Sequence, residues 1–187
     1  MLSSGKTAPQ FRLPDQTGAT QDAKALKGKR YLVYFYPKDS TPGCTTQACG
    51  LQSDLEQFNR LGIAVFGVSM DSVASHRKFA DKYKLEFPLL ADTEKSLIEA
   101  YGVWVEKSMY GKKYMGISRS SFLVGSNGKI EHVWEKVNTK THAVDVLAFI
   151  NGAKSESTPA KKSAVKKPAV KKAPVKTAPA KKSVKKK

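Results

Sequence analysis

The sequence has no long apolar run, few cysteines and few acidic residues. Its longest nearly unbroken apolar stretch, 61–70, covers ten residues, whereas a membrane-spanning helix needs about 20. The first residues contain no apolar core of a secretory signal, so none is expected. Two cysteines in 187 residues are too few for a disulfide scaffold. We therefore expect a cytoplasmic protein without a membrane span, whose cysteines stay reduced and serve chemistry rather than folding.

Acidic residues are scarce mainly at the C-terminal end. The whole chain has 33 Lys+Arg against 16 Asp+Glu and a formal net charge of +17. Residues 154–187 contain 13 lysines and one glutamate, so they carry +12 and the other 153 residues carry only +5. All 17 aromatic residues lie at or before Phe149. The sequence thus predicts a globular domain over residues 1–152 and a cationic tail over residues 153–187.

The tail contains no glycine and no aromatic residue, and its lysine groups begin at five-residue intervals from position 161 to position 181. Four prolines interrupt any helix. Such a segment cannot bury enough apolar surface to offset its ordering entropy, which predicts disorder. It is either a solvated polycation that raises solubility, or a sequence-independent contact for nucleic acid. The candidate contacts are Lys161, Lys162, Lys166, Lys167, Lys171, Lys172, Lys181 and Lys182.

The Lys/Ala/Pro repeat of the tail resembles the tails of linker histones and of some bacterial nucleoid proteins. This likeness implies nucleoid association, or a nuclear location in a eukaryote. A contact with an anionic membrane surface is a further alternative. Because no aromatic residue or arginine interleaves the lysines, neither base stacking nor base readout is expected.

Strand and helix signals alternate along the domain. Continuous apolar runs at 31–36 and 63–68 predict strands buried on both faces. Two further strand predictions are a short strand at 87–90 and a hairpin of 121–124 with 129–135. The predicted helices run from about 44 to 61, ended by Gly62, from a cap at Asp71 or Ser72 to Tyr83, from Thr93 to Ala100, and from 141 to 151. His76 is expected on a solvated face of the second of these helices. This order predicts a three-layer α/β domain with a mixed central sheet.

Cys44 follows Pro42-Gly43 where a predicted strand gives way to a helix, so we expect it in the first helical turn. Unpaired N–H groups and the positive end of the helix dipole favour a thiolate there. Such surroundings turn a cysteine into a nucleophile. Gly43 allows a substrate to approach the backbone, and Thr41 can direct a hydroxyl to the same point. Ligands of open α/β sheets bind at this kind of strand end.

Cys49 lies five residues beyond Cys44. On one regular helix the two residues are about 140° apart around the axis and about 7.5 Å apart along it. Their Cα atoms are then roughly 8–9 Å apart, whereas a disulfide needs about 4.4–6.8 Å. The pair therefore predicts a nucleophile and a resolving thiol that meet only when the helix unwinds. Gly50 makes that unwinding less costly than alanine would.

Several separated motifs resemble the peroxiredoxins. The segment from Pro37 to Cys44, Pro-Lys-Asp-Ser-Thr-Pro-Gly-Cys, is similar to their Pro-xxx-Thr-xx-Cys motif. The spacing from Cys44 to Cys49 resembles the bacterioferritin-comigratory, or Q-type, subfamily. Segments 8–18, 67–71, 87–92 and 116–124 are similar as well, so the resemblance covers about residues 3–151 and leaves out the tail.

The resemblance implies a thioredoxin-like fold and a thiol peroxidase for hydrogen peroxide or alkyl hydroperoxides. Cys44 would attack the peroxide, Cys49 would resolve the sulfenic acid to a disulfide, and thioredoxin would reduce that disulfide. Thr41 would hydrogen-bond the peroxide, Arg119 would favour the thiolate and stabilise the departing oxygen, and Pro37 would shield the thiolate. A monomer is implied, and no metal or organic cofactor.

Other interpretations of the same residues stay open. Either cysteine could be an inert buried residue, and Arg119 could form a structural ion pair. A disulfide-exchange enzyme normally carries Cys-x-x-Cys, which this sequence lacks. The alternative from a different class is a nucleic-acid-associated protein that binds through its tail and has a redox-sensing body.

Overall fold

The computed structural model describes residues 1–109 and 111–152. The predicted tail, with its eight candidate lysines, lies outside the described residues. The strands are β1 (Arg12–Pro14), β2 (Thr20–Asp22), β3 (Arg30–Phe35), β4 (Ile63–Ser69), β5 (Leu89–Ala91), β6 (Trp104–Met109), β7 (Lys112–Ile117), β8 (Ser120–Val124) and β9 (Ile130–Trp134). The helices are the 3₁₀ helix η1 (Ala23–Leu26) and the α-helices α1 (Pro42–Ser53), α2 (Leu55–Arg60), α3 (Val73–Tyr83), α4 (Ser96–Ala100) and α5 (His142–Ile150).

Strand β3 is the centre of a mixed five-stranded sheet with the order β5-β4-β3-β8-β9. It runs parallel to β4 and antiparallel to β8, so Val33 pairs with Phe66 on one side and with Phe122 on the other. Every residue of β3 after Arg30 is buried. The continuous apolar run of the sequence is thus a strand covered on both faces, as predicted.

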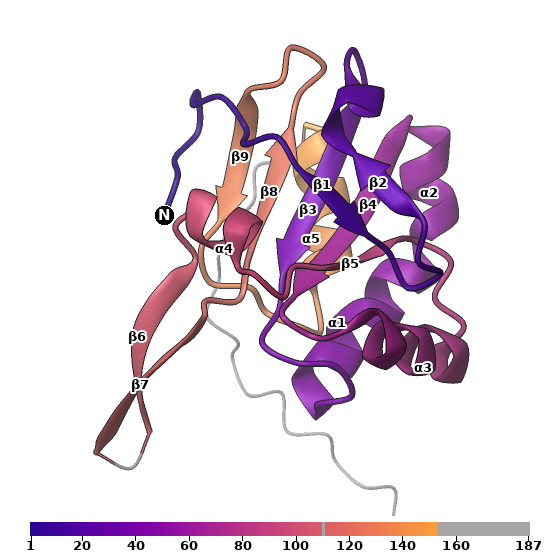
Figure 1. Ribbon diagram of the computed structural model, residues 1–187. Coiled ribbons are helices and arrows are strands. Elements are labelled where there is room, and N and C mark those ends of the chain that lie inside the picture. Colours follow the sequence, from indigo (N-terminus) through magenta and orange to yellow (C-terminus); the bar gives the residue numbers. More distant parts are fainter. Residues whose placement is uncertain (110, 153–187) are drawn as a thin grey trace, which may run out of the picture. The chain divides into compact units, whose positions relative to one another are not determined.

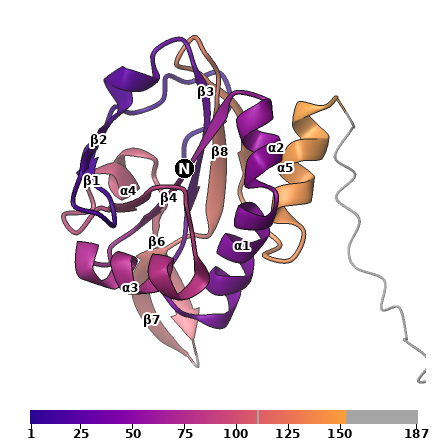
Figure 2. The same ribbon diagram turned by 90° about the vertical axis from the view of Figure 1, so that its right-hand side faces the viewer.

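Alternate residues of β3 belong to two hydrophobic cores, one on each face of the sheet. Leu32 and Tyr34 pack in a core that includes residues of α1, α2 and α5. Val33 and Phe35 pack in a second core with residues of η1 and α4. Figure 2 shows the sheet between these two layers. The predicted three-layer α/β architecture with a mixed central sheet is confirmed.

The predicted helix from about 44 to 61 is wrong as a single element. It is divided at Asp54, whose φ of −101° and ψ of 7° end α1 and begin α2. Aspartate competes with helical backbone bonding and therefore favours such a boundary. Leu61, which the periodicity placed on the buried face, is 41 % exposed. Gly62 does end the helical segment, with a φ of +69° that glycine adopts without strain.

Among the predicted helix starts, that of α3 is confirmed and that of α4 is wrong. Ser72 caps α3, and its side chain accepts a hydrogen bond from the Ser75 amide. Helix α4, in contrast, begins at Ser96 rather than at Thr93. The buried Asp92 carboxylate accepts from the amides of the second and third residues of α4 at 2.9 and 2.8 Å. A carboxylate satisfies these amides better than a hydroxyl, so Asp92 takes the capping role.

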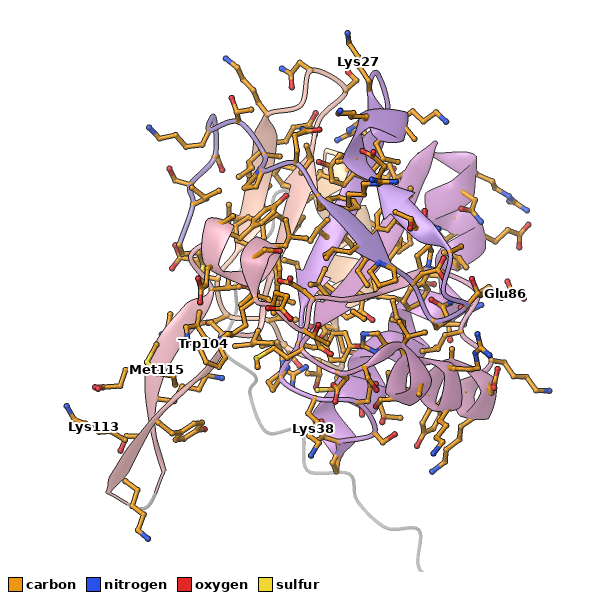
Figure 3. The ribbon with its side chains drawn as sticks, viewed as in Figure 1. Lys27, Lys38, Glu86, Trp104, Lys113 and Met115 are labelled. Carbon is orange, nitrogen blue, oxygen red and sulfur yellow. The ribbon has the colours of Figure 1, made fainter. Side chains whose placement is uncertain are left out.

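Two hairpins were not predicted, β1–β2 and β6–β7. Strands β1 and β2 have only three residues each and show no apolar alternation. Strands β6 and β7 pair along six residues each, and their hairpin projects from the body (Figure 1). Lys113 and Met115 mark its outer part in Figure 3. Among the described residues, no helix is long and apolar enough to cross a membrane.

Candidate active site

Cys44 lies at the start of α1, directly beyond the carboxyl end of β3. Helix α1 has Thr41 as its N-cap and Pro42 as its first residue, so Cys44 is its third residue, as predicted. The amides of Gly43 and Cys44 precede the first backbone bond of the helix, which runs from the Thr45 amide to the Thr41 carbonyl. These amides give the sulfur a positive electrostatic environment. The Cys44 side chain is only 1 % exposed.

Arg119 is the residue that the fold brings to this sulfur from far along the chain. Antiparallel pairing of Phe35 with Ser120 sets the start of β8 beside the end of β3. The Arg119 guanidinium Nη2 therefore reaches the Cys44 Sγ at 3.3 Å and donates a hydrogen bond to it. A charged donor at this distance stabilises a thiolate and any negative charge that develops beside it.

Gly43 gives this guanidinium its space. A Cβ built on Gly43 would lie 3.3 Å from Arg119 Nη2 and 3.7 Å from the Thr139 methyl group. An alanine at position 43 would therefore press on the guanidinium group beside the sulfur.

Thr41 and Pro37 stand in the loop before α1. The Thr41 hydroxyl donates to the Lys38 carbonyl at 3.1 Å, which leaves its oxygen free to accept. Ser40 adopts a left-handed φ of 58°, and this turn sets Thr41 at the helix start. Pro37 begins the loop and is exposed. Lys38 lies at the lower end of the body in Figure 3.

Cys49 lies on the same uninterrupted helix and is half-buried. Both cysteines are free thiols. Helical geometry separates their Cα atoms by roughly 8–9 Å, which is beyond the range of a disulfide. The structure is thus the reduced, folded form of α1, in which the two sulfurs cannot bond.

Gln47 is a site residue that the sequence interpretation missed. It lies one helical turn beyond Cys44, and it is 1 % exposed. Its Oε1 accepts a hydrogen bond from Arg119 Nη1 at 2.7 Å, and its Nε2 lies 3.2 Å from the Nδ1 of His142. The i, i+3 spacing from Cys44 was the available signal, because such residues share a helix face. Gln47 thus holds one terminal nitrogen of the guanidinium group while the other donates to the sulfur.

His142 begins α5 and is 2 % exposed. Burial, followed by the charge of Arg119, lowers the pKa of His142 from 6.5 to about 3. The ring is therefore neutral at physiological pH. No local pattern in the sequence pointed to His142, since its contact with Gln47 depends on the packing of α5 against α1.

Lys107 of β6 adds a second positive charge close to the site. Its Nζ donates to the Ile117 carbonyl, two residues before Arg119. Burial, followed by repulsion from Arg119, lowers the pKa of Lys107, while attraction to Cys44 opposes this effect. Arg119 thus contacts the thiol directly, and Lys107 adds positive charge in its neighbourhood.

A second buried network holds the loop before α1, and it corrects a prediction. His76 was expected on a solvated face of α3 but is fully buried. Its Nδ1 lies 2.9 Å from Asp39 Oδ2, and its Nε2 lies 3.2 Å from the Leu90 carbonyl. Asp39 Oδ1 also accepts from the Tyr36 hydroxyl at 2.8 Å. These partners take the place of water around the buried His76 ring. The apolar pattern of α3 gave no sign of them.

The Asp39 carboxylate is stabilised in its charged form. Burial alone would raise its pKa, but hydrogen bonds from His76, Ser75 and Tyr36 and attraction to His76 outweigh burial and lower the pKa. The Asp39 amide also donates to the Asp71 carboxylate at 2.8 Å. Asp71 therefore fastens the loop that leads to Cys44. Within the described ranges 1–109 and 111–152, no three or more acidic, histidine or cysteine side chains gather as a metal site would require.

Comparison with known proteins identifies the class of this fold and site. The AhpC/TSA family matches residues 4–133. Peroxiredoxin Bcp of Escherichia coli strain K12 is 46 % identical over 149 residues, which cover 80 % of this chain and 96 % of that protein.

Two solved structures from Xanthomonas campestris are similar in fold and sequence. Peroxiredoxin Q is 41 % identical with a TM-score of 0.73, and the match covers 76 % of this chain and 90 % of that chain. A bacterioferritin comigratory protein, described for its alkyl peroxide reduction activity, is 40 % identical with a TM-score of 0.72 and the same coverage. The chain belongs to the AhpC/TSA family and, within it, to the Bcp or Q-type peroxiredoxins, which are thiol peroxidases with a thioredoxin-like fold.

Proposed function

We propose that Cys44 is the nucleophile with which this thiol peroxidase reduces peroxides. The observation that carries the proposal is the 3.3 Å hydrogen bond from Arg119 to a buried sulfur at a helix N-terminus. The Cys44 thiolate attacks one peroxide oxygen, so an S–O bond forms and the O–O bond breaks. Cys44 becomes a sulfenic acid, and the departing oxygen takes up a proton to leave as water or an alcohol. Arg119 stabilises the charge on that oxygen.

Two loop residues complete the proposed peroxide site. The Thr41 hydroxyl accepts a hydrogen bond from the peroxide or donates one to it, after a rotation away from the Lys38 carbonyl. The ring of Pro37 fixes its backbone φ and so restricts the conformation of the loop before α1. The restricted loop limits solvent access to the Cys44 thiolate.

Cys49 is the proposed resolving residue. Its sulfur attacks the Cys44 sulfenic acid, so an S–S bond forms and the S–O bond breaks. The hydroxyl group leaves as water with the thiol proton of Cys49. Because both residues occupy one regular helix, α1 must first lose its helical conformation between them.

The proposed reductant is thioredoxin, which would reduce the Cys44–Cys49 disulfide by thiol–disulfide exchange. The proposed substrates are hydrogen peroxide and alkyl hydroperoxides, supported by the alkyl peroxide reduction described for the X. campestris relative. We further propose that the protein acts as a monomer in the cytoplasm.

Two cysteine variants test this cycle. Cys44→Ser abolishes peroxide consumption in a thioredoxin-coupled assay and leaves the circular dichroism spectrum unchanged. Cys49→Ser consumes one equivalent of peroxide and then stalls or over-oxidises at Cys44. Full turnover by Cys44→Ser would refute the nucleophile, and normal thioredoxin-linked turnover by Cys49→Ser would remove that residue from the cycle.

The tail supports a second activity, because its +12 charge in 34 residues is a strong attractor for polyanions. We propose that it binds nucleic acid without sequence preference and thereby keeps part of the protein at the nucleoid. Truncation after Gly152 leaves peroxidase rates unchanged and abolishes DNA retention at low salt. Equal DNA binding by the truncated protein would contradict the role of the tail in binding nucleic acid. Full loss of peroxidase activity would contradict the claim that the domain works without the tail.

A further inference from the structure

A chain of hydrogen bonds runs inward from the nucleophilic sulfur. Arg119 donates to Cys44 Sγ at 3.3 Å through Nη2 and to Gln47 Oε1 at 2.7 Å through Nη1. Since Gln47 Oε1 is thereby the acceptor, its Nε2 is the donor toward the Nδ1 of His142, 3.2 Å away. The Nδ1 must then carry a lone pair, and the ring proton resides on Nε2.

His142 is suited to this accepting role by its surroundings. Its ring is packed among aromatic groups, with ring centroids 6.4 Å from Tyr34 and 6.3 Å from Trp134. Its Nε2 has no hydrogen-bond partner among the residues that the structure describes. An imidazolium here would need acceptors that these neighbours do not offer, so the neutral ring is the stable form.

The titratable and charged groups near His142 also favour the neutral form of its ring. Arg119 faces the ring across Gln47, and burial and this positive charge lower the pKa of His142 to about 3. Helix α1 places the Gln47 amide against the ring, β3 places the Tyr34 phenol there, and β9 places the neutral Trp134 there, with the titratable His132 packed behind Trp134.

On α5 itself, Asp145 accepts a hydrogen bond from the Thr141 hydroxyl at 2.8 Å. This carboxylate is therefore engaged at the start of its own helix. The structure records no hydrogen bond or ion pair between it and His142 among the described residues.

We propose that His142 is a positioning residue, which holds the Gln47 amide so that Arg119 faces Cys44, and which is released when Cys44 and Cys49 form their disulfide. The proposal rests on the two-cysteine cycle proposed above. Gln47 lies between the two cysteines in sequence, so it is part of the segment that must leave the helix for the sulfurs to meet. Its bonds to Arg119 and His142 exist only in the folded α1. These two hydrogen bonds, here called the latch, hold the reduced enzyme in its reactive geometry, and formation of the disulfide breaks them.

The release has a measurable consequence at His142. Once α1 unwinds, water reaches the ring, and its pKa rises from about 3 toward the ordinary 6.5. Below pH 6.5 the released ring takes up a proton from solvent, whereas the latched ring does not. By linkage, lowering the pH favours the unwound state, by about tenfold at pH 5.5.

Proton NMR of the three histidine rings tests the release directly. The reduced protein and the protein oxidised with one equivalent of hydrogen peroxide are titrated, and the His142 signal is assigned from the His142→Leu spectrum. We expect no His142 titration above pH 4.5 in the reduced protein and a midpoint near pH 6.5 in the oxidised protein. The same midpoint in both states would refute the release.

Kinetics test the positioning role. His142→Leu removes the acceptor, so the rate constant for peroxide reduction falls by about 10- to 100-fold. His142→Asn supplies a carbonyl acceptor and restores most of that rate. His132→Leu is the matched control and keeps the wild-type rate, because His132 packs on Phe149 and Trp134 and, among the described residues, makes no hydrogen bond to Gln47, Arg119 or His142.

Both measurements separate the inference from the cycle on which it rests. A wild-type rate in His142→Leu, or equal losses in His142→Leu and His142→Asn at unchanged melting temperature, would overturn the positioning role. Loss of two hydrogens on oxidation establishes the disulfide independently of His142. If that mass change is seen but the His142 midpoint is the same in both states, the release of His142 is refuted and the two-cysteine cycle stands. If no disulfide forms, the cycle and the release are both refuted.

Discussion

Replacing Gly50 with alanine tests whether α1 must unwind before Cys49 reaches Cys44. Gly50 is the helical residue next to Cys49, and a Cβ built there meets no atom within 4 Å. Alanine therefore fits the folded helix without displacement and stabilises it by about 0.8–1.0 kcal/mol relative to glycine. A gain of this size lowers the population of the unwound state about fivefold.

The assay separates the two chemical steps. Reduced protein is mixed with one equivalent of hydrogen peroxide, quenched at intervals, and analysed by mass for sulfenic acid and disulfide at Cys44. In Gly50→Ala the sulfenic acid forms at the wild-type rate, because the folded site is unchanged. The disulfide then forms about fivefold more slowly, and over-oxidation increases.

The control places the same kind of substitution in a helix that keeps its conformation. Val144 is 62 % exposed on α5, and Val144→Ala raises helix propensity by up to about 0.7 kcal/mol. It should raise the melting temperature without slowing disulfide formation. A Gly50→Ala protein that is more stable but forms the disulfide at the wild-type rate would refute the unwinding step.

Four further changes have defined outcomes. Arg119→Met slows peroxide reduction by about 10²–10³-fold in stopped-flow assays, because it removes the cation 3.3 Å from the nucleophilic sulfur; a wild-type rate would leave it a structural role. Thr41→Val slows the same reaction by about 10²-fold, whereas Thr41→Ser retains most activity, and equal rates in both variants would exclude the hydroxyl. Asp39→Asn lowers the free energy of unfolding in urea by about 1–3 kcal/mol, since it disrupts the hydrogen bonds of a buried carboxylate with Tyr36, Ser75 and His76; an unchanged free energy of unfolding would contradict that role. The His142 pKa is about 3 when folded and about 6.5 when unfolded, so stability is complete above pH 6.5 and falls toward pH 3. Between pH 7 and pH 5 this protonation lowers the free energy of unfolding by about 2 kcal/mol. The His142→Leu protein has no ionisable group at this position, so it should not show this decrease.

Local patterns were enough to predict the central strands of the sheet and the position of Cys44 at the start of a helix. The apolar run that forms β3 is buried on both faces, and Pro42-Gly43 marks the start of α1 as expected. Arg119 could be assigned only through family resemblance, because its approach to Cys44 depends on the pairing of β8 with β3. Periodicity describes one element at a time and carries no information about which elements become neighbours.

The residues that hold the site in place were less predictable for the same reason. His76 looks like a solvent-facing residue on α3, yet it is buried because Asp39 and the Leu90 carbonyl replace its water. Gln47 and His142 are 95 positions apart in sequence and meet only when α5 packs on α1. Polar residues buried with partners from other elements break the hydrophobic pattern, so sequence reasoning assigns them to the surface.

The most direct test of the account is the mass of reduced protein after one equivalent of hydrogen peroxide, followed by peptide mapping. The account predicts the loss of two hydrogens and a cross-link between Cys44 and Cys49. Oxygen added at Cys44 without a cross-link would contradict the assignment of Cys49 and the unwinding of α1. No change at either cysteine would contradict the proposed nucleophile itself.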